Sequence, residues 1–134
     1  MKFSYKKQIL EHHLDTFGHV NNAVYLELYE EARWDFITEA GFGLDHVQET
    51  QIGPVILDIT VNYKAELKNR ENIIIESEYK GMKNSLVCSV YQTMTKEDGT
   101  LASEITLSIG VLDMKNRKLI KPSSEWLKAF GERE

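Results

Sequence analysis

Several kinds of residue and segment are scarce in this chain, and each scarcity excludes a class of protein. A single cysteine among 134 residues, Cys88, rules out an internal disulfide and a cysteine-cluster metal site. The chain has two prolines and no repeat or low-complexity segment, so we expect a single domain over residues 1–134. Charged residues make up 28% and hydrophobic residues 42%, proportions that exclude a disordered chain.

Long apolar runs and an excess of basic charge are missing as well. No run approaches the roughly 20 apolar residues of a transmembrane helix, and residues 1–8 lack the apolar stretch of a secretory signal. The net charge of −5 argues against broad affinity for nucleic acid. We therefore expect a cytoplasmic protein that binds neither nucleic acid nor a membrane.

The chain does contain a clear division between a helical pattern and a strand pattern. In residues 22–40 apolar side chains recur at steps of three and four, which predicts a helix, and Gly41 follows where a helix commonly ends. Residues 42–51 are expected to form a mixed connection. Residues 123–131 predict a short helix opened by serines that can cap it. Alternation at steps of two predicts strands over residues 2–10, 55–64, 72–81, 86–94 and 101–111.

This order of elements predicts an α+β fold. Strands that follow one another through tight turns must pair antiparallel, because parallel pairing needs a long crossover. The helix is apolar around much of its circumference, so we expect the sheet to curl around it. Apolar residues on the outer face, Ile74, Val87 and Tyr91, leave a surface that pairing of two copies would cover.

A carboxylate, Asp15, precedes the predicted helix by a few residues, and Gly18, His19, Asn21 and Asn22 lie between. This arrangement brings a general base close to the unpaired N–H groups of a helix start, as cleavage of an acyl bond requires. The simpler interpretation is that Asp15 caps a helix or a turn. Gly18 suits a tight turn or a close approach of substrate, and either asparagine can cap the helix.

The same segment resembles a known family. The matching residues are Asp15, Gly18, His19, Val20, Asn21 and Asn22, followed by Tyr25, Tyr29, Glu30, Ala32 and Arg33. They are similar to the signature of the hotdog-fold acyl-CoA thioesterases of the 4-hydroxybenzoyl-CoA thioesterase type, and residues 116–122 look like that family's usual finish. The resemblance implies a hotdog fold, in which a five-stranded antiparallel sheet wraps around a long central helix.

For function, the resemblance implies hydrolysis of an acyl-CoA thioester to a free acid and CoA. Asp15 is then the catalytic carboxylate, acting as general base or nucleophile, and the N–H of Asn22 or its neighbour polarises the carbonyl. His19 joins this catalytic set. The resemblance also implies a homodimer or homotetramer with active sites at the subunit interface, and the reaction needs no cofactor.

Further residues are candidates for binding the substrate. Gly18 and Asn21 adjoin the catalytic residues in the chain, and Tyr25 and Tyr29 lie one helical turn apart, where they suit an acyl pocket. Core packing is the simpler interpretation of both tyrosines. Acyl carrier protein is an alternative to CoA as the carrier of the acyl group. Among the basic clusters and turns, the candidates for binding CoA are Lys83, Asn84 and Arg117.

Other chemistries fit the sequence less well. His12, His13, Asp15 and His19 include metal-ligand types, but their spacing matches no helical or hairpin ligand scheme, so we expect no metal. Cys88 lies on the apolar face of a strand and is expected to be buried. A hotdog dehydratase would carry His-Phe-Pro or Asp-x-Asn-x-x-His, and neither occurs. A non-catalytic hotdog module that binds acyl-CoA or acyl carrier protein stays open as the alternative function.

Overall fold

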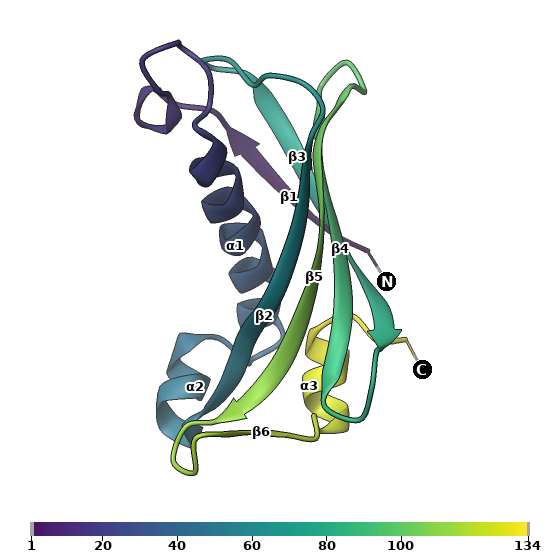
Figure 1. Ribbon diagram of the computed structural model, residues 1–134. Helices are drawn as coiled ribbons and strands as arrows, with labels where there is room; N and C mark the ends of the chain where they lie inside the picture. Colours follow the sequence, from purple (N-terminus) through teal and green to yellow (C-terminus); the bar gives the residue numbers. More distant parts are fainter. Residues whose placement is uncertain (1, 134) are drawn as a thin grey trace.

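The computed structural model describes residues 2–133, so Met1 and Glu134, the ends of the predicted domain, lie outside the described residues. Figure 1 shows a curved sheet with helix α1 lying along its concave face. In chain order the elements are β1 (Lys2–Gln8), the 3₁₀ helix η1 (Glu11–His13), α1 (Asn22–Glu39), α2 (Leu44–Thr50), β2 (Ile52–Tyr63), β3 (Asn72–Met82), β4 (Val87–Lys96), β5 (Leu101–Asp113), β6 (Lys118–Ile120) and α3 (Ser124–Ala129).

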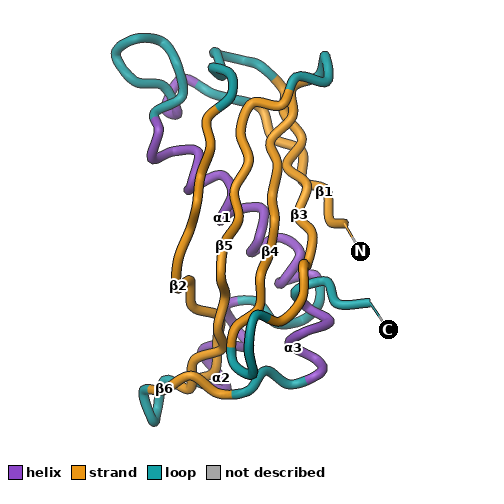
Figure 2. Tube along the Cα trace, turned by 45° about the vertical axis from the view of Figure 1, so that its right-hand side comes forward, coloured by secondary structure: helices purple, strands orange, loops and turns teal. Residues whose placement is uncertain are grey.

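The sheet is antiparallel throughout, as the tight turns predict. The strands lie in the order β1-β3-β4-β5-β2, with β6 paired to β5 (Figure 2). Strand β2 pairs with β5 from Ile52↔Asp113 to Tyr63↔Ser103, and a register shift between Ile56 and Asp58 marks a bulge. Because β1 and β2 are the ends of this order, β2 presents a long edge beside the start of α1.

The core lies between α1 and the inner face of the sheet. Helix α1 ends where predicted, because Gly41 has a φ of +89° and the Phe42 N–H donates to the Ile37 carbonyl at 3.0 Å. The helix residues that pack against the sheet are at most 4% exposed, and they are Tyr25, Leu28, Tyr29, Ala32, Phe36 and Ile37. Cys88, at 0% exposed, is buried as expected.

Short elements account for the differences between prediction and structure. Five strands were predicted, but residues 118–120 form a sixth, β6, opposite residues 111–113 of β5. Residues 42–51, predicted as a connection, contain α2, which at seven residues is too short to show a repeated helical pattern. The α+β class is unaffected. Within residues 2–133, no helix is both long enough and apolar enough to cross a membrane.

Three of the exposed large apolar side chains lie on strand β2, and the others, Phe17, Leu44, Ile74 and Met82, are spread over the loop before α1, α2 and β3. Leu57, Ile59 and Tyr63 are 45%, 37% and 46% exposed. On the outer face Ile74 is 40% exposed, whereas Tyr91 is partly buried and its hydroxyl donates to Glu104 at 2.8 Å. The unpaired β2 edge of the sheet therefore carries several exposed apolar side chains.

Candidate active site

The loop that carries Asp15 is a tight turn between η1 and α1. The Asp15 N–H donates to the His19 carbonyl at 2.9 Å, and the Gly18 N–H donates to the Asp15 carbonyl at 3.1 Å. Leu14 and Val20 form an antiparallel bridge just outside this turn. Gly18 has a φ of +79°, in the region that favours glycine, so the turn explains the glycine.

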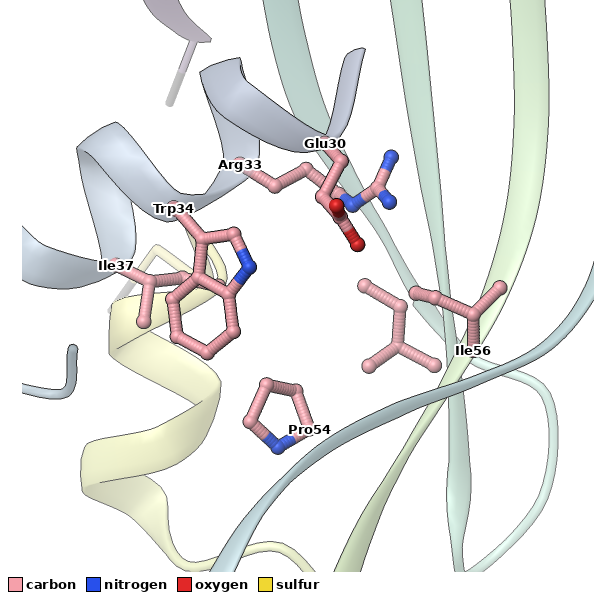
Figure 3. Close-up of a pocket in the computed structure, with 7 residues that line it drawn as sticks. Glu30, Arg33, Trp34, Ile37, Pro54 and Ile56 are labelled. Carbon is pink, nitrogen blue, oxygen red and sulfur yellow. The ribbon is translucent and has the colours of Figure 1, made fainter. Parts of the chain in front are cut away.

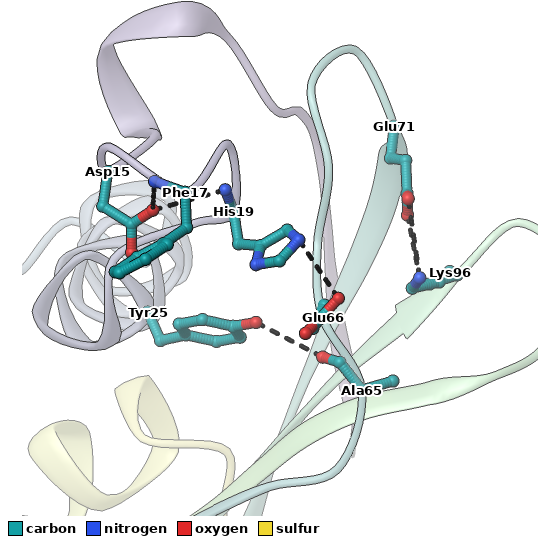
Figure 4. A network of polar contacts seen from close by, with 8 residues as sticks. All are labelled: Asp15, Phe17, His19, Tyr25, Ala65, Glu66, Glu71 and Lys96. Atoms are coloured by element: carbon teal, nitrogen blue, oxygen red, sulfur yellow. Dashed lines mark hydrogen bonds and ion pairs between the residues drawn. The ribbon is translucent and has the colours of Figure 1, made fainter.

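The Asp15 carboxylate uses one of its oxygens to hold this turn. Oδ1 accepts the Phe17 N–H at 2.8 Å and lies 3.4 Å from the His19 N–H (Figure 4). Within the described residues no donor is bonded to Oδ2, and Asp15 is partly exposed. Asp15 is therefore a turn residue, as the simpler interpretation held, and it also keeps an oxygen available for a bound water.

The first turn of α1 leaves an amide free. Asn21 is the N-cap, because its Oδ1 accepts the Ala23 N–H at 2.9 Å and its carbonyl accepts the Val24 N–H at 2.9 Å. The Asn22 N–H has no acceptor anywhere in residues 2–133. A free N–H at a helix N-terminus stabilises negative charge that lies close to it. The amide suited to an oxyanion is thus the one on Asn22.

Asp15 and Asn22 line the same hollow, an open depression of about 390 Å³. Its walls come from the Asp15 loop, the first turn of α1 and the segment that follows β2. The other lining residues are His19, Val20, Tyr25, Tyr63, Lys64, Ala65 and Glu66. The hollow therefore combines a carboxylate, a free amide and two aromatic rings at the edge of the sheet.

Several residues that line the hollow were not predicted from the sequence. Tyr63, Lys64, Ala65 and Glu66 were not among the candidate site residues. These residues follow the motif by about forty positions, and the pairing of β2 with β5 and of His19 with Lys68 brings them to it. The one available signal was an aromatic residue at the end of a strand predicted to face the helix.

His19 makes its side-chain contact with one of these missed residues. Its Nε2 lies 3.2 Å from Glu66 Oε2, and the two side chains are 36% and 64% exposed (Figure 4). The backbone of His19 meanwhile pairs with that of Asp15 across the turn. His19 thus links the Asp15 loop to the segment after β2, and its ring stands at the rim of the hollow.

The two tyrosines of the motif have different places. Tyr25 lines the hollow, and its hydroxyl donates to the Ala65 carbonyl at 3.3 Å. Burial raises the pKa of Tyr25, which keeps this hydroxyl protonated as a donor. Tyr29 is 0% exposed in the core and does not line the hollow. Core packing, the simpler interpretation, therefore describes Tyr29, whereas Tyr25 combines core packing with the site.

The residues predicted to bind CoA are not brought to this hollow within one chain. Lys83 and Asn84 lie in the β3–β4 turn and Arg117 in the β5–β6 turn, and both turns are at the other end of the sheet from the loop before α1 (Figure 1). Lys83 Nζ donates to Ser108 Oγ at 2.8 Å, and Asn84 Oδ1 accepts the Leu86 N–H at 2.9 Å. The first contact ties the turn to β5, and the second lies within the turn.

A second, smaller cavity of about 60 Å³ lies farther along α1. Figure 3 shows Glu30, Arg33 and Trp34 of the helix facing Pro54 and Ile56 of β2 across it. Arg33 is 7% exposed, and burial lowers the pKa of its guanidinium. In residues 2–133 no cluster of three His, Cys, Asp or Glu side chains could hold a metal ion.

Comparison with known proteins identifies the family. Residues 10–130 match the family model described as the thioesterase-like superfamily. The chain belongs to that superfamily. The long-chain acyl-CoA thioesterase FadM of Escherichia coli is 30% identical to this thioesterase-like chain over 115 residues, which cover 85% of this chain and 86% of FadM.

Solved structures agree with this membership in the thioesterase-like superfamily. The probable thioesterase YbaW of Escherichia coli has a TM-score of 0.82 at 26% identity, and the match covers 94% of each chain. A Staphylococcus aureus protein solved in complex with CoA has a TM-score of 0.88 at 18% identity, covering 96% of this chain and 81% of that one. The hotdog fold is confirmed, and the chain is a thioester hydrolase by family.

Proposed function

We propose that this thioester hydrolase acts on acyl-CoA, with Asp15 and the Asn22 N–H as its catalytic groups. The observation that carries the proposal is that Asp15 and the free Asn22 amide line one hollow. As a base, Asp15 would activate a water for attack on the carbonyl, an effect of about 10²–10⁴ in rate. As a nucleophile, it would form an acyl anhydride that water then hydrolyses.

The Asn22 amide supplies the second requirement of the reaction. Negative charge develops on the carbonyl oxygen as the tetrahedral intermediate forms, and one donor at that position contributes about 10²–10³ in rate. Because the amide stands at the start of an 18-residue helix, the helix dipole adds to its effect. His19 joins this catalytic set as the residue that holds the Asp15 turn and faces Glu66.

The substrate that we propose is a long-chain acyl-CoA, since FadM is a long-chain acyl-CoA thioesterase and the YbaW and CoA-complex structures share the fold. Gly18, Asn21 and Tyr25 would contact the thioester end of the substrate. Acyl carrier protein is the alternative carrier. Lys83, Asn84 and Arg117 would reach CoA only from a second copy of the chain, because they lie away from this hollow.

We propose a homodimer or homotetramer in which a second copy covers the β2 edge. The exposed Leu57, Ile59 and Tyr63 lie on that edge, beside the hollow. Multi-angle light scattering during size-exclusion chromatography measures the molar mass, and a monomer at micromolar concentration would contradict this part of the proposal. Further parts of the proposal are that the protein is cytoplasmic and works without cofactor or metal.

The decisive test is a panel of acyl-CoA substrates of graded chain length, with release of CoA followed by a thiol reagent. We expect hydrolysis by the wild type and a loss of about 10²–10⁴ in kcat for Asp15→Asn. Activity equal in the two proteins would overturn the role of Asp15. Retention of acyl-CoA by mass spectrometry without turnover would favour the non-catalytic binding module instead.

A single-turnover reaction in heavy-oxygen water separates the two roles of Asp15. If Asp15 activates water, the label enters the released acid directly. If Asp15 attacks the carbonyl, hydrolysis of the anhydride at its aspartyl carbon leaves label in the carboxylate of Asp15, which mass spectrometry of the peptide detects. The substrate for this test is the best one of the panel.

A further inference from the structure

The end of strand β2 is tied to the first turn of α1 by a tyrosine whose ring is half exposed. Tyr63, the last residue of β2, donates its hydroxyl to the Asn22 carbonyl at 2.8 Å. The two residues are 41 positions apart in the chain, so the contact is tertiary. At 46% exposure Tyr63 is a poor contributor to the core, and burial does not account for this contact.

A second tyrosine makes the reciprocal tie. Tyr25, in the first turn of α1, donates its hydroxyl to the Ala65 carbonyl at 3.3 Å. The rings of Tyr25 and Tyr63 meet edge to face, with centroids 5.0 Å apart and an interplanar angle of 84°. The segment beyond β2 is itself fixed to β5, because the N–H groups of Lys64 and Ala65 both donate to the Ala102 carbonyl, at 2.8 and 3.0 Å.

The atom that Tyr63 holds belongs to the residue whose amide faces the hollow. The Asn22 carbonyl and the free Asn22 N–H flank the same Cα, so fixing the carbonyl limits where the N–H can point. The Val20 N–H donates to the Leu67 carbonyl at 3.0 Å and the Asn21 N–H to the His13 carbonyl at 3.2 Å, but neither bond involves an atom of Asn22. The contact between Tyr63 and Asn22 thus links the amide to the rigid sheet rather than to the Asp15 loop.

We infer that Tyr63 is a positioning residue, which sets the Asn22 amide at the distance from Asp15 that the oxyanion requires. This inference rests on the proposed function. An oxyanion donor must lie about 2.7–3.1 Å from the oxygen, and a misplacement of about 1 Å can lower the rate about 10²-fold. Because the amide contacts the oxygen most strongly when that oxygen is charged, misplacing it lowers kcat more than it raises KM.

The test is Tyr63→Phe, which removes the hydroxyl and keeps the ring against Tyr25. We expect kcat to fall about tenfold, a fraction of the loss of a whole oxyanion donor, while KM changes less than about twofold. The matched control is Tyr91→Phe, because the Tyr91 hydroxyl makes a bond of the same length, 2.8 Å, to Glu104 on the outer face of the sheet. This control should keep the wild-type kcat.

Several outcomes decide the inference. A Tyr63→Phe enzyme whose kcat equals that of the wild type or of Tyr91→Phe would overturn it. A rise in KM without a change in kcat would also overturn it, since that result makes Tyr63 a wall of the acyl site. Tyr63→Leu removes the ring contact as well and should lower kcat further than Tyr63→Phe.

A readout without substrate keeps this inference separate from the proposed function. Amide hydrogen exchange at Asn22, Ala23 and Val24 reports how firmly the first turn of α1 is held. We expect faster exchange at these amides in Tyr63→Phe than in either the wild type or Tyr91→Phe. If no acyl-CoA is hydrolysed and this difference is present, the proposed function fails while the positioning of the amide stands. Equal exchange in all three proteins would contradict the positioning itself.

Discussion

Helix α1 carries two groups of polar side chains and amides that differ in how deeply they are buried. In its middle, Arg33 Nη1 donates to Gln92 Oε1 at 2.9 Å, and Gln92 Nε2 donates to Ser77 Oγ and the Tyr29 carbonyl at 2.9 and 3.2 Å. Gln92 is 0% exposed, and its amide uses both its oxygen and its nitrogen there. This network attaches the helix to strands β3 and β4 from inside the core.

The polar groups at the helix start face solvent, whereas Gln92 in the middle network is fully buried. Asp15 Oδ2 and the Asn22 N–H have no partner within the described part of the chain, and both residues line a hollow open to solvent. Buried polar groups without partners destabilise a protein, whereas at an open site they are hydrated and available to a ligand. The middle of α1 therefore contributes to stability, and its start presents groups that a ligand can contact.

The largest expected effect is on activity at the helix start. Asp15→Asn keeps an oxygen for the Phe17 N–H but loses the charge, so kcat should fall about 10²–10⁴-fold with little change in Tm. Asp98→Asn is the matched control, because Asp98 Oδ1 accepts the Thr100 N–H at 2.9 Å in the same kind of turn. Equal losses of activity in the two variants would contradict a catalytic role for Asp15 beyond its role in the turn.

The next effect should appear in stability at the middle of the helix. Gln92→Leu preserves volume but leaves the Arg33 guanidinium, 7% exposed, without its partner, so unfolding free energy should fall by about 3 kcal/mol. Urea denaturation measures this loss, and Gln48→Leu on the exposed face of α2 should stay within about 0.5 kcal/mol of wild type. If Gln92→Leu proved as stable as wild type, the network would not anchor α1.

A smaller effect tests whether the cap of α1 serves both regions. Asn21→Ala removes the acceptor of the Ala23 N–H and should lower the unfolding free energy by about 1 kcal/mol. Ser123→Ala removes the corresponding cap of α3, where Ser123 Oγ accepts the Trp126 N–H at 3.1 Å. Both variants should lose similar stability, but only Asn21→Ala should also lower kcat, by a few-fold. A cap that affected activity equally in both helices would count against a special role for the α1 start.

The smallest effect concerns pH and the residue just before the active loop. His13 is 6% exposed, its Nδ1 accepts the Leu10 N–H at 2.8 Å, and burial is the main cause that lowers its pKa below 6.5. The unfolded chain therefore takes up this proton first, so the stability from His13 is complete above pH 6.5 and is lost as pH falls. Between about pH 7.5 and about pH 5.5, Tm should fall less in His13→Gln than in wild type, while exposed His12→Gln should behave as wild type.

The parts of the fold that were predicted are those with long, regular patterns. The helix was expected over residues 22–40 and spans 22–39, and the strand expected over residues 101–111 spans 101–113. The elements that were not predicted have three or seven residues. The helices among them span fewer than two turns, and the strand is too short to show an alternating pattern. The length of the sequence pattern, more than the type of residue, decides which elements could be predicted.

The candidate site follows a different rule. Asp15 and Asn22 are close in the chain, so their proximity followed from local sequence, and the motif pointed to the same pair. Tyr63 reaches the hollow through the register of β2 on β5, and Glu66 through the pairing of His19 with Lys68; no local pattern specifies either. Which amide of the first turn is free also depended on the choice of Asn21 as cap, a choice that the two adjacent asparagines left open.

The burial of Cys88 has a consequence for an enzyme whose product is itself a thiol. Thiolates attack disulfides, so a reactive cysteine in contact with CoA and its disulfide would form a mixed disulfide with the product. Burial raises the pKa of Cys88 to about 11, and its side chain is 0% exposed within the sheet. The single sulfhydryl of this chain is thereby kept from thiol–disulfide exchange with the CoA that each turnover releases.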